Sequence, residues 1–261
     1  MPAILEQRAS SAAPWARWLG SFTVVLFLTA ALSHRFRLID TPPFLWLLGL
    51  CFLLAVIGLL VSALAFTQMW RRGVSGITDA TLGALLSLGA LVPYGVSAYH
   101  SFANPPLSDI STDPTRPPPL QFAAAVRLLP MNAVADPTQQ TISLQQKAYP
   151  ELSGKLYEQP RENVVEQVVA LMEDRGWEVV SPARPADAVS SQNVVIEAVA
   201  YSYLLGFPSD VSVRIEDRGE ATYVDMRSAS RYGRHDLGEN ATRIQRFLSD
   251  LDSRIRAQAA P

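Results

Sequence analysis

An uninterrupted apolar segment, residues 44–66, restricts the fold of this chain more than any other feature. It contains no charged residue. A helix rises about 1.5 Å per residue, so roughly 20 apolar residues cross the ~30 Å hydrocarbon core of a bilayer. Two further apolar segments flank it, residues 15–32 and 77–99. The sequence therefore predicts a multi-pass α-helical membrane anchor of three helices within residues 1–100.

The outer two segments admit other interpretations. Residues 15–32 could be a secretory signal peptide, but no cleavage site of small residues follows cleanly, and residues 34–43 are typical of a short loop between spans. Residues 77–99 contain Pro93, which membrane helices tolerate, and Asp79. An acid within a span can mark a transport site, but one in the first turn is typical of a helix start at the interface. We interpret all three helices as retained and as an anchor.

The distribution of arginine predicts the orientation, because cytoplasmic loops are enriched in Lys and Arg. One side of the membrane would hold Arg8, Arg17, Arg71 and Arg72, and the other would hold Arg35, Arg37 and, farther along, Arg116. This small excess favours a cytoplasmic N-terminus, and three spans then place the C-terminal domain in the periplasm. Basic residues are almost all arginine, which suggests a bacterial genome rich in GC and hence the bacterial inner membrane.

Residues 101–145 differ in composition and are rich in proline. Because proline lacks an N–H and restricts the residue before it, we expect an extended, semi-rigid linker. Asp109 and Asp113 lack the glycine and the final acid of a calcium loop, so we expect no metal. Cys51 is the single cysteine, which excludes a disulfide framework. A net charge of −2 gives no reason to expect nucleic acid, and no motif indicates a cofactor.

Residues 146–261 have the pattern of a soluble α+β domain. An amphipathic helix begins at Pro160 and ends before Gly176. Strands are expected at residues 177–181, 193–203, 210–216 and 221–228, and a last helix at 236–257. Short connections between successive strands predict a two-layer sandwich, a four-stranded antiparallel meander with two helices on one face. The other face, with Glu197, Arg214, Asp225 and Arg227, would be exposed to water.

A hairpin is predicted around the sequence Asp217-Arg-Gly-Glu220. If Arg218 and Gly219 form a two-residue loop, counting outward gives the register of the two strands. Apolar residues then meet on one face, with Val213 opposite Val224. On the other face Asp210 meets Arg227, and opposite charges on paired strands are favourable.

The most polar part of the chain, residues 225–243, which we call the signature, joins the last strand to the last helix. It reads Asp-Met-Arg-Ser-Ala-Ser-Arg-Tyr-Gly-Arg-His-Asp-Leu-Gly-Glu-Asn-Ala-Thr-Arg. Together with Gly206-Phe-Pro-Ser-Asp-Val and Asp109-Ile-Ser-Thr-Asp113, it resembles the family named domain of unknown function 1499. The resemblance covers roughly residues 109–251. It implies an architecture but no catalytic residues.

Three interpretations of the signature remain. In the first it is structural: arginines pair with acids, Asp236 caps the last helix, and Glu239 completes a capping box. The residues assigned this role are Asp210, Asp225, Arg227, Asp236 and Glu239. In the second it binds an anion near the helix start, through Ser228, Ser230, Arg231, Arg234 and Asn240. In the third, catalysis by Ser230, His235 and Asp236, the adjacent His and Asp cannot easily form a relay.

Two functions follow from these interpretations. In one, the domain is an interaction module that binds an envelope protein or an anionic ligand. In the other, the protein is a membrane-tethered hydrolase that acts on lipid or cell-wall material. The lack of a nucleophile motif favours the binding module over the enzyme.

Overall fold

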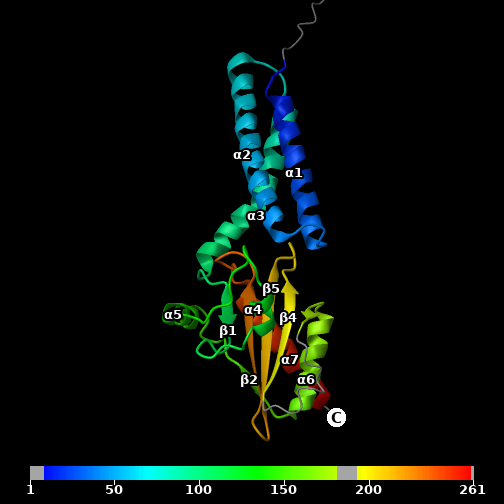
Figure 1. Cartoon of the computed structure of the whole chain (residues 1–261). Helices are drawn as coiled ribbons and strands as arrows, with labels where there is room; N and C mark the ends of the chain where they lie inside the picture. Colours follow the sequence, from blue (N-terminus) through cyan, green and yellow to red (C-terminus); the bar gives the residue numbers. More distant parts are fainter. Residues whose placement is uncertain (1–8, 181–192, 260–261) are drawn as a thin grey trace, which may run out of the picture. The chain divides into compact units, whose positions relative to one another are not determined.

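The computed structural model describes residues 9–180 and 193–259 of the chain (Figure 1). It divides into two compact units, residues 1–99 and 100–261. Each unit has its own packed residues, and the two are described in turn.

The first unit contains the three predicted apolar helices. They are α1 (Ala13–Arg35), α2 (Thr41–Arg72) and α3 (Ile77–Ala103), whose last four residues belong to the second unit. All three are long and apolar enough to cross a membrane. The predicted anchor is thus confirmed, and each helix extends beyond the apolar segment that predicted it.

Small residues allow the three helices to approach closely. A Cβ built on Gly20 of α1 would lie 2.9 Å from the carbonyl oxygen of Gly83 in α3, so any side chain there would clash. Gly58 of α2 lies directly against the hydroxyl of Ser87 in α3 in the same way. Association of apolar helices in lipid depends on such close packing. Asp79 forms an exposed ion pair with Arg17 of α1 at 3.1 Å. The acid of the third span therefore has a structural role between two helices.

The second unit is built on a six-stranded antiparallel sheet (Figure 1). Its strands are β1 (Asp109–Ser111), β2 (Lys155–Tyr157), β3 (Glu178–Val179), β4 (Asn193–Tyr201), β5 (Pro208–Asp217) and β6 (Thr222–Ser230). The order β1-β6-β5-β4-β3 contains the predicted meander of the last four strands. β1 and β2 both pair with β6 and were not predicted. The end of the predicted strand 177–181, at residue 181, lies outside the described residues.

The predicted register of the β5–β6 hairpin is wrong by two residues. Val213 lies opposite Met226, and Arg214 lies opposite Asp225. The loop contains four residues, 218–221, because Arg218 N–H donates to the Ala221 carbonyl oxygen at 2.9 Å. The Asp217 carboxylate also accepts the N–H of Gly219 at 2.8 Å, and Gly219 has a φ of 83°. Since the shift is even, every side chain keeps its predicted face.

One face of the sheet forms the apolar core with two amphipathic helices. These are α6 (Arg161–Asp174) and α7 (Glu239–Ala259), as predicted (Figure 1). The sheet contributes Val194, Ile196, Val211, Val213, Ile215, Val224 and Met226, and the helices contribute Val164, Val168, Met172, Ile244, Phe247 and Leu251. The ring of Trp177 stacks on Phe247 with centroids 5.2 Å apart. Burial of these side chains supplies the main driving force for folding.

The opposite face of the sheet, predicted to be exposed to water, is buried. Glu197, Arg214, Asp225 and Arg227 are each at most 7% exposed. Residues 112–136, which we call the covering segment, lie over this face. Leu120 and Ala123 of the segment pack against Ala229 of β6. The proline-rich stretch is part of the domain rather than a spacer. Its strand β1 pairs with β6, and the covering segment brings polar groups that bind the charged groups of the sheet.

A short helix of the covering segment, α4 (Gln121–Val126), is capped by the sheet beneath it. The Glu197 carboxylate accepts the backbone N–H groups of Gln121 at 2.7 Å, Phe122 at 3.1 Å and Ala123 at 3.3 Å. The first N–H groups of a helix have no partner within the helix, and an anion at that end is favourable. Glu197 thus joins the covering segment to β4.

The helix α5 (Gln139–Ala148) closes the free side of β1. The Gln145 side-chain amide donates to the carbonyl oxygen of Ser111 at 2.6 Å and accepts the Ser111 N–H at 3.2 Å. A side chain therefore makes the two hydrogen bonds that a neighbouring strand would make. The outer edge of β1 is therefore covered at Ser111 by α5.

Replacing Glu197 by Gln is expected to loosen α4. The amide offers one neutral carbonyl oxygen in place of a carboxylate, and hydrogen bonds to a charged group contribute about 1.5–3 kcal/mol each. Hydrogen exchange of the full-length protein in detergent, read by mass spectrometry, should show the amides of residues 121–126 exchanging about 10-fold faster or more. Glu166→Gln, an exposed change on α6, is the control. Equal exchange in the two variants would contradict the capping role.

Candidate functional site

The signature occupies the end of β6, the loop 231–238 and the first turns of α7. The loop turns sharply, with positive φ at Gly233, Leu237 and Gly238. Gly238 is confined further, because a Cβ there would clash with the side chain of Asn104. The turn brings β6 and the start of α7 together, so residues far apart in the signature come into contact.

Asp236 caps α7. Its carboxylate accepts the N–H groups of Gly238 and Asn240, each at 2.9 Å. The predicted reciprocal bond from Glu239 is not made: the Asp236 N–H donates to the carbonyl oxygen of Leu107, and Glu239 instead accepts from Arg243 at 2.8 Å. Burial raises the pKa of the Asp236 and Glu239 carboxyls and lowers that of the Arg243 guanidinium. The hydrogen bond from Asp236 to Leu107 fastens the start of α7 to the segment before β1.

Three of the five predicted anion-binding residues form one internal network. The Ser228 hydroxyl donates to the Asn240 side-chain oxygen at 2.8 Å, and the Asn240 amide donates to the Ser230 hydroxyl at 3.0 Å. Arg243 donates to the same Asn240 oxygen at 2.7 Å. Ser228 and Asn240 are fully buried. These polar groups hydrogen-bond to one another and hold α7 on β6, so they are placed as structural groups rather than as ligand contacts.

The fourth predicted residue, Arg231, is committed to Asp210. Its guanidinium donates to both carboxylate oxygens, at 2.7 and 3.0 Å. Arg127 of the covering segment donates to the same carboxylate at 2.7 Å and to the Ala229 carbonyl oxygen at 2.8 Å. The side chains of Arg127 and Asp210 are each only 3% exposed. Asp210 therefore pairs with two guanidiniums rather than with Arg227, the partner predicted from the two-residue loop.

Arg227 has a partner other than the predicted Asp210, and Asp225 pairs with an arginine that lies outside the signature. Arg227 makes a bidentate ion pair with Asp109 of β1, at 2.6 and 2.9 Å. Asp225 is fully buried and pairs with Arg214. Burial raises the pKa of Asp225 to about 6, although the Arg214 guanidinium acts in the opposite direction. The ionic residues of β5 and β6 thus serve to bind strands and the covering segment to one another.

The structure does not assemble Ser230, His235 and Asp236 into a catalytic relay. The Nδ1 atom of His235 accepts the Leu237 N–H at 2.9 Å, and Nε2 lies 3.2 Å from the Asn104 carbonyl oxygen. Asp236 binds the helix start, and Ser230 binds Asn240. Both nitrogens of the imidazole thus contact backbone groups, so this arrangement provides no base for a serine nucleophile.

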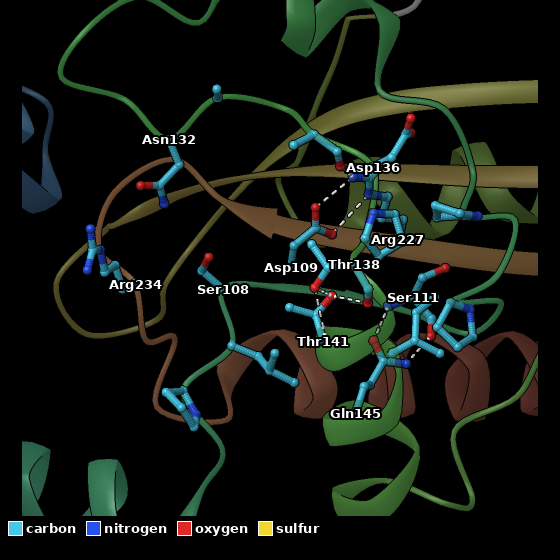
Figure 2. A pocket seen from close by; sticks show the side chains of 18 residues that line it. Ser108, Asp109, Ser111, Asn132, Asp136, Thr138, Thr141, Gln145, Arg227 and Arg234 are labelled. Atoms are coloured by element: carbon cyan, nitrogen blue, oxygen red, sulfur yellow. Dashed lines mark hydrogen bonds and ion pairs between the residues drawn. The ribbon is translucent and has the colours of Figure 1, made fainter.

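A pocket of about 410 Å³ lies beside the signature, between β1, the covering segment and the start of α5 (Figure 2). Four prolines, Leu107 and Ile142 give it apolar walls. Polar groups come from Ser108, Asn132, Thr138, Thr141 and Gln145, and charged groups from Asp109, Asp136, Arg227 and Arg234. Apolar walls with a few polar groups are typical of small-ligand sites.

Of the predicted anion-binding residues, only Arg234 lines this pocket. It is exposed, and no acid pairs with it in the part of the chain that the structure describes. Asp109 and Arg227 neutralise each other. Figure 2 shows Arg234 near Ser108 and Asn132, with Asp136 on the far side of the pocket. The Arg234 side of the pocket is therefore positive.

Sequence reasoning missed Ser108, which directly precedes β1, and the residues that the covering segment brings to the site, above all Asn132 and Arg127. Their partners lie about a hundred positions away, as for Asn132, which donates to the Gly233 carbonyl oxygen at 2.7 Å. A single basic residue within the apolar run 122–129 was the one available signal. Across residues 9–180 and 193–259 no three Asp, Glu, His or Cys side chains gather as metal ligands do.

The fold and site define a class: a membrane-anchored α+β protein whose sheet has one apolar face and one ionic face, both buried. The family model described as a protein of unknown function, DUF1499, matches residues 109–251. Since this is more than half of the chain, the protein belongs to that family. The match begins at the first residue of β1 and includes the covering segment. A comparison with curated proteins found no match.

The stability of the domain should depend on the ionisation of Asp225. Its pKa is about 6 in the folded protein against an ordinary 3.8, so the folded state holds the proton more tightly than the unfolded chain. The contribution of this group to the free energy of unfolding therefore falls as the pH rises from 3.8 to about 6. Asp225→Asn cannot ionise and should lose this part of the pH dependence.

Urea denaturation of residues 100–261 across this pH range measures the effect, and the difference between the wild-type and variant curves isolates Asp225. Asp217→Asn, an exposed change at the end of β5, should leave the wild-type pH dependence in place. Parallel curves for the wild type and Asp225→Asn would show that Asp225 does not titrate in this range.

Proposed function

We propose that this protein is an anchored binding module of the bacterial inner membrane, whose domain holds a small anionic ligand in the pocket beside the signature. One observation carries the proposal: Arg234 is a guanidinium without an acidic partner in the described structure, at the edge of a pocket of about 410 Å³. Guanidinium groups bind phosphate and carboxylate through paired hydrogen bonds. The other ionic groups of the signature are already matched.

The neighbours of Arg234 suit a phosphate ester better than a bare ion. Ser108 presents a hydroxyl on the same side of the pocket, and Asn132 lies beside it (Figure 2). The proline and leucine walls would contact an organic substituent. Thr138 and Thr141 bring further hydroxyls from the start of α5. Asp136, on the opposite side, would repel a second negative charge and so favours a ligand with a single anionic group.

The ligand site is tested by Arg234→Gln in the full-length protein in detergent. Loss of one charge-assisted contact costs about 1.5–3 kcal/mol, so affinity should fall by about 10-fold or more. Titration calorimetry with glycerol phosphate, a sugar phosphate and inorganic phosphate provides the measurement. Arg246→Gln, which removes an exposed arginine of α7 away from the pocket, should bind as the wild type does. Wild-type protein that binds none of the three probes at millimolar concentration would refute the site.

We also propose that the N-terminus is cytoplasmic and the domain periplasmic. The arginines on the N-terminal side of α1 and at the end of α2 outnumber those of the α1–α2 loop, and positive loops stay in the cytoplasm. An alkaline phosphatase fused after Pro261 should therefore be active, because that enzyme folds only outside the cytoplasm. A green fluorescent protein at the same position should be dark. A bright fluorescent fusion with inactive phosphatase would reverse the orientation.

A further inference from the structure

Two pairs of apolar side chains in the second unit are exposed to solvent. Leu128 and Leu129 follow α4 in the covering segment, and Leu129 is 96% exposed. Tyr203 and Leu204 form the turn after β4, where Tyr203 is 87% exposed. Single exposed apolar residues need no explanation, but large ones gathered together mark an interaction site.

The two pairs lie at the same end of the sheet. The turn that carries Tyr203 is closed by the Ser202 N–H, which donates to the Phe207 carbonyl oxygen at 2.9 Å. The turn after Leu129 is tied to the residue that follows β6, because the Asn132 N–H donates to the Arg231 carbonyl oxygen at 2.7 Å. The Arg231 N–H in turn donates to Pro208, the first residue of β5, at 3.1 Å. β4 ends, β5 begins and β6 ends at this point.

The chain also enters the unit at this end. The Asn104 side-chain amide donates to the Leu237 carbonyl oxygen at 3.2 Å, in the loop that follows β6. Asn104 directly follows α3, a helix long and apolar enough to span a membrane. The chain between α3 and this end of the unit is therefore only a few residues long. At the opposite end, the end of β5 and the hairpin loop expose the charged side chains of residues 217, 218 and 220.

We propose that this end of the domain inserts Leu128, Leu129, Tyr203 and Leu204 into the surface of the bilayer in which α1–α3 are anchored. Tyrosine is enriched where the hydrocarbon core meets the headgroups, and leucine side chains supply the buried apolar area that holds a peripheral segment there. A bilayer fits this surface because two short turns can reach the headgroup–acyl boundary. Binding to a bilayer also requires no groove and no pairing of strands, unlike binding to a peptide.

Fluorescence quenching on the full-length protein tests this contact. In a Cys51→Ala background, Leu129→Cys and Leu204→Cys are each labelled with bimane and reconstituted in phosphatidylcholine–phosphatidylglycerol vesicles, with and without brominated lipid. Leu156→Cys is the matched control: Leu156 is an exposed leucine of β2, and its partner Tyr223 lies next to the hairpin loop at the opposite end. Thermal unfolding of each labelled protein checks that the fold is unchanged.

Brominated lipid should remove most of the bimane fluorescence at positions 129 and 204 and little at position 156. A label at 129 or 204 that is quenched no more than the label at 156 would overturn the proposal. The readout does not depend on which side of the vesicle the domain occupies, because the same bilayer carries the quencher on both sides. It also does not involve Arg234, so its outcome is separate from that of the ligand titration.

Discussion

The fold of the second unit depends on one electrostatic requirement: each charge on the second face of the sheet must have a partner before it is buried. A carboxylate or guanidinium taken out of water without a partner costs far more than one hydrogen bond returns. The strands themselves supply two such partnerships, because Arg214 pairs with both Asp225 and Glu216. Others come from outside the meander, from Asp109, from Arg127 and from the first N–H groups of α4. The covering segment, although proline-rich and poor in regular structure, is therefore as much a part of the domain as the helices of the apolar face.

Features set by local rules could be predicted from the sequence. Runs of apolar residues predicted the three membrane helices, and periodicity predicted α6, α7 and the face of each side chain in β5 and β6. The register of the hairpin failed because Asp217 and Gly219 allow a four-residue loop as well as a two-residue one. The choice depends on pairing along the whole length of both strands. Since both loops give the same alternation, the error placed Arg227 opposite Asp210 instead of Ser212 without moving it to the other face.

The signature shows a different limit. Its density of charge was visible at once, and Asp236 was placed correctly at the start of the last helix by its position alone. The partner of Arg227 could not be deduced, because it is Asp109 of β1, which lies more than a hundred positions earlier. The second guanidinium on Asp210 could not be deduced either, because it comes from Arg127 of the covering segment. Alternation of polar and apolar residues along a strand is the same whether the polar face meets water or a layer of matched polar groups. Sequence alone therefore could not distinguish an exposed face from a covered one.

The pairing of Gln145 with Ser111 has a consequence for the association of one copy of this protein with another. A strand at the border of a sheet offers unpaired backbone groups to any passing chain, which is a common route to aggregation and unwanted strand addition. Here both free backbone groups of Ser111 are bound by one side-chain amide. Anchoring in a membrane confines the copies of a protein to two dimensions, where their domains can meet. One glutamine on α5 thus shields the β1 border from neighbouring copies.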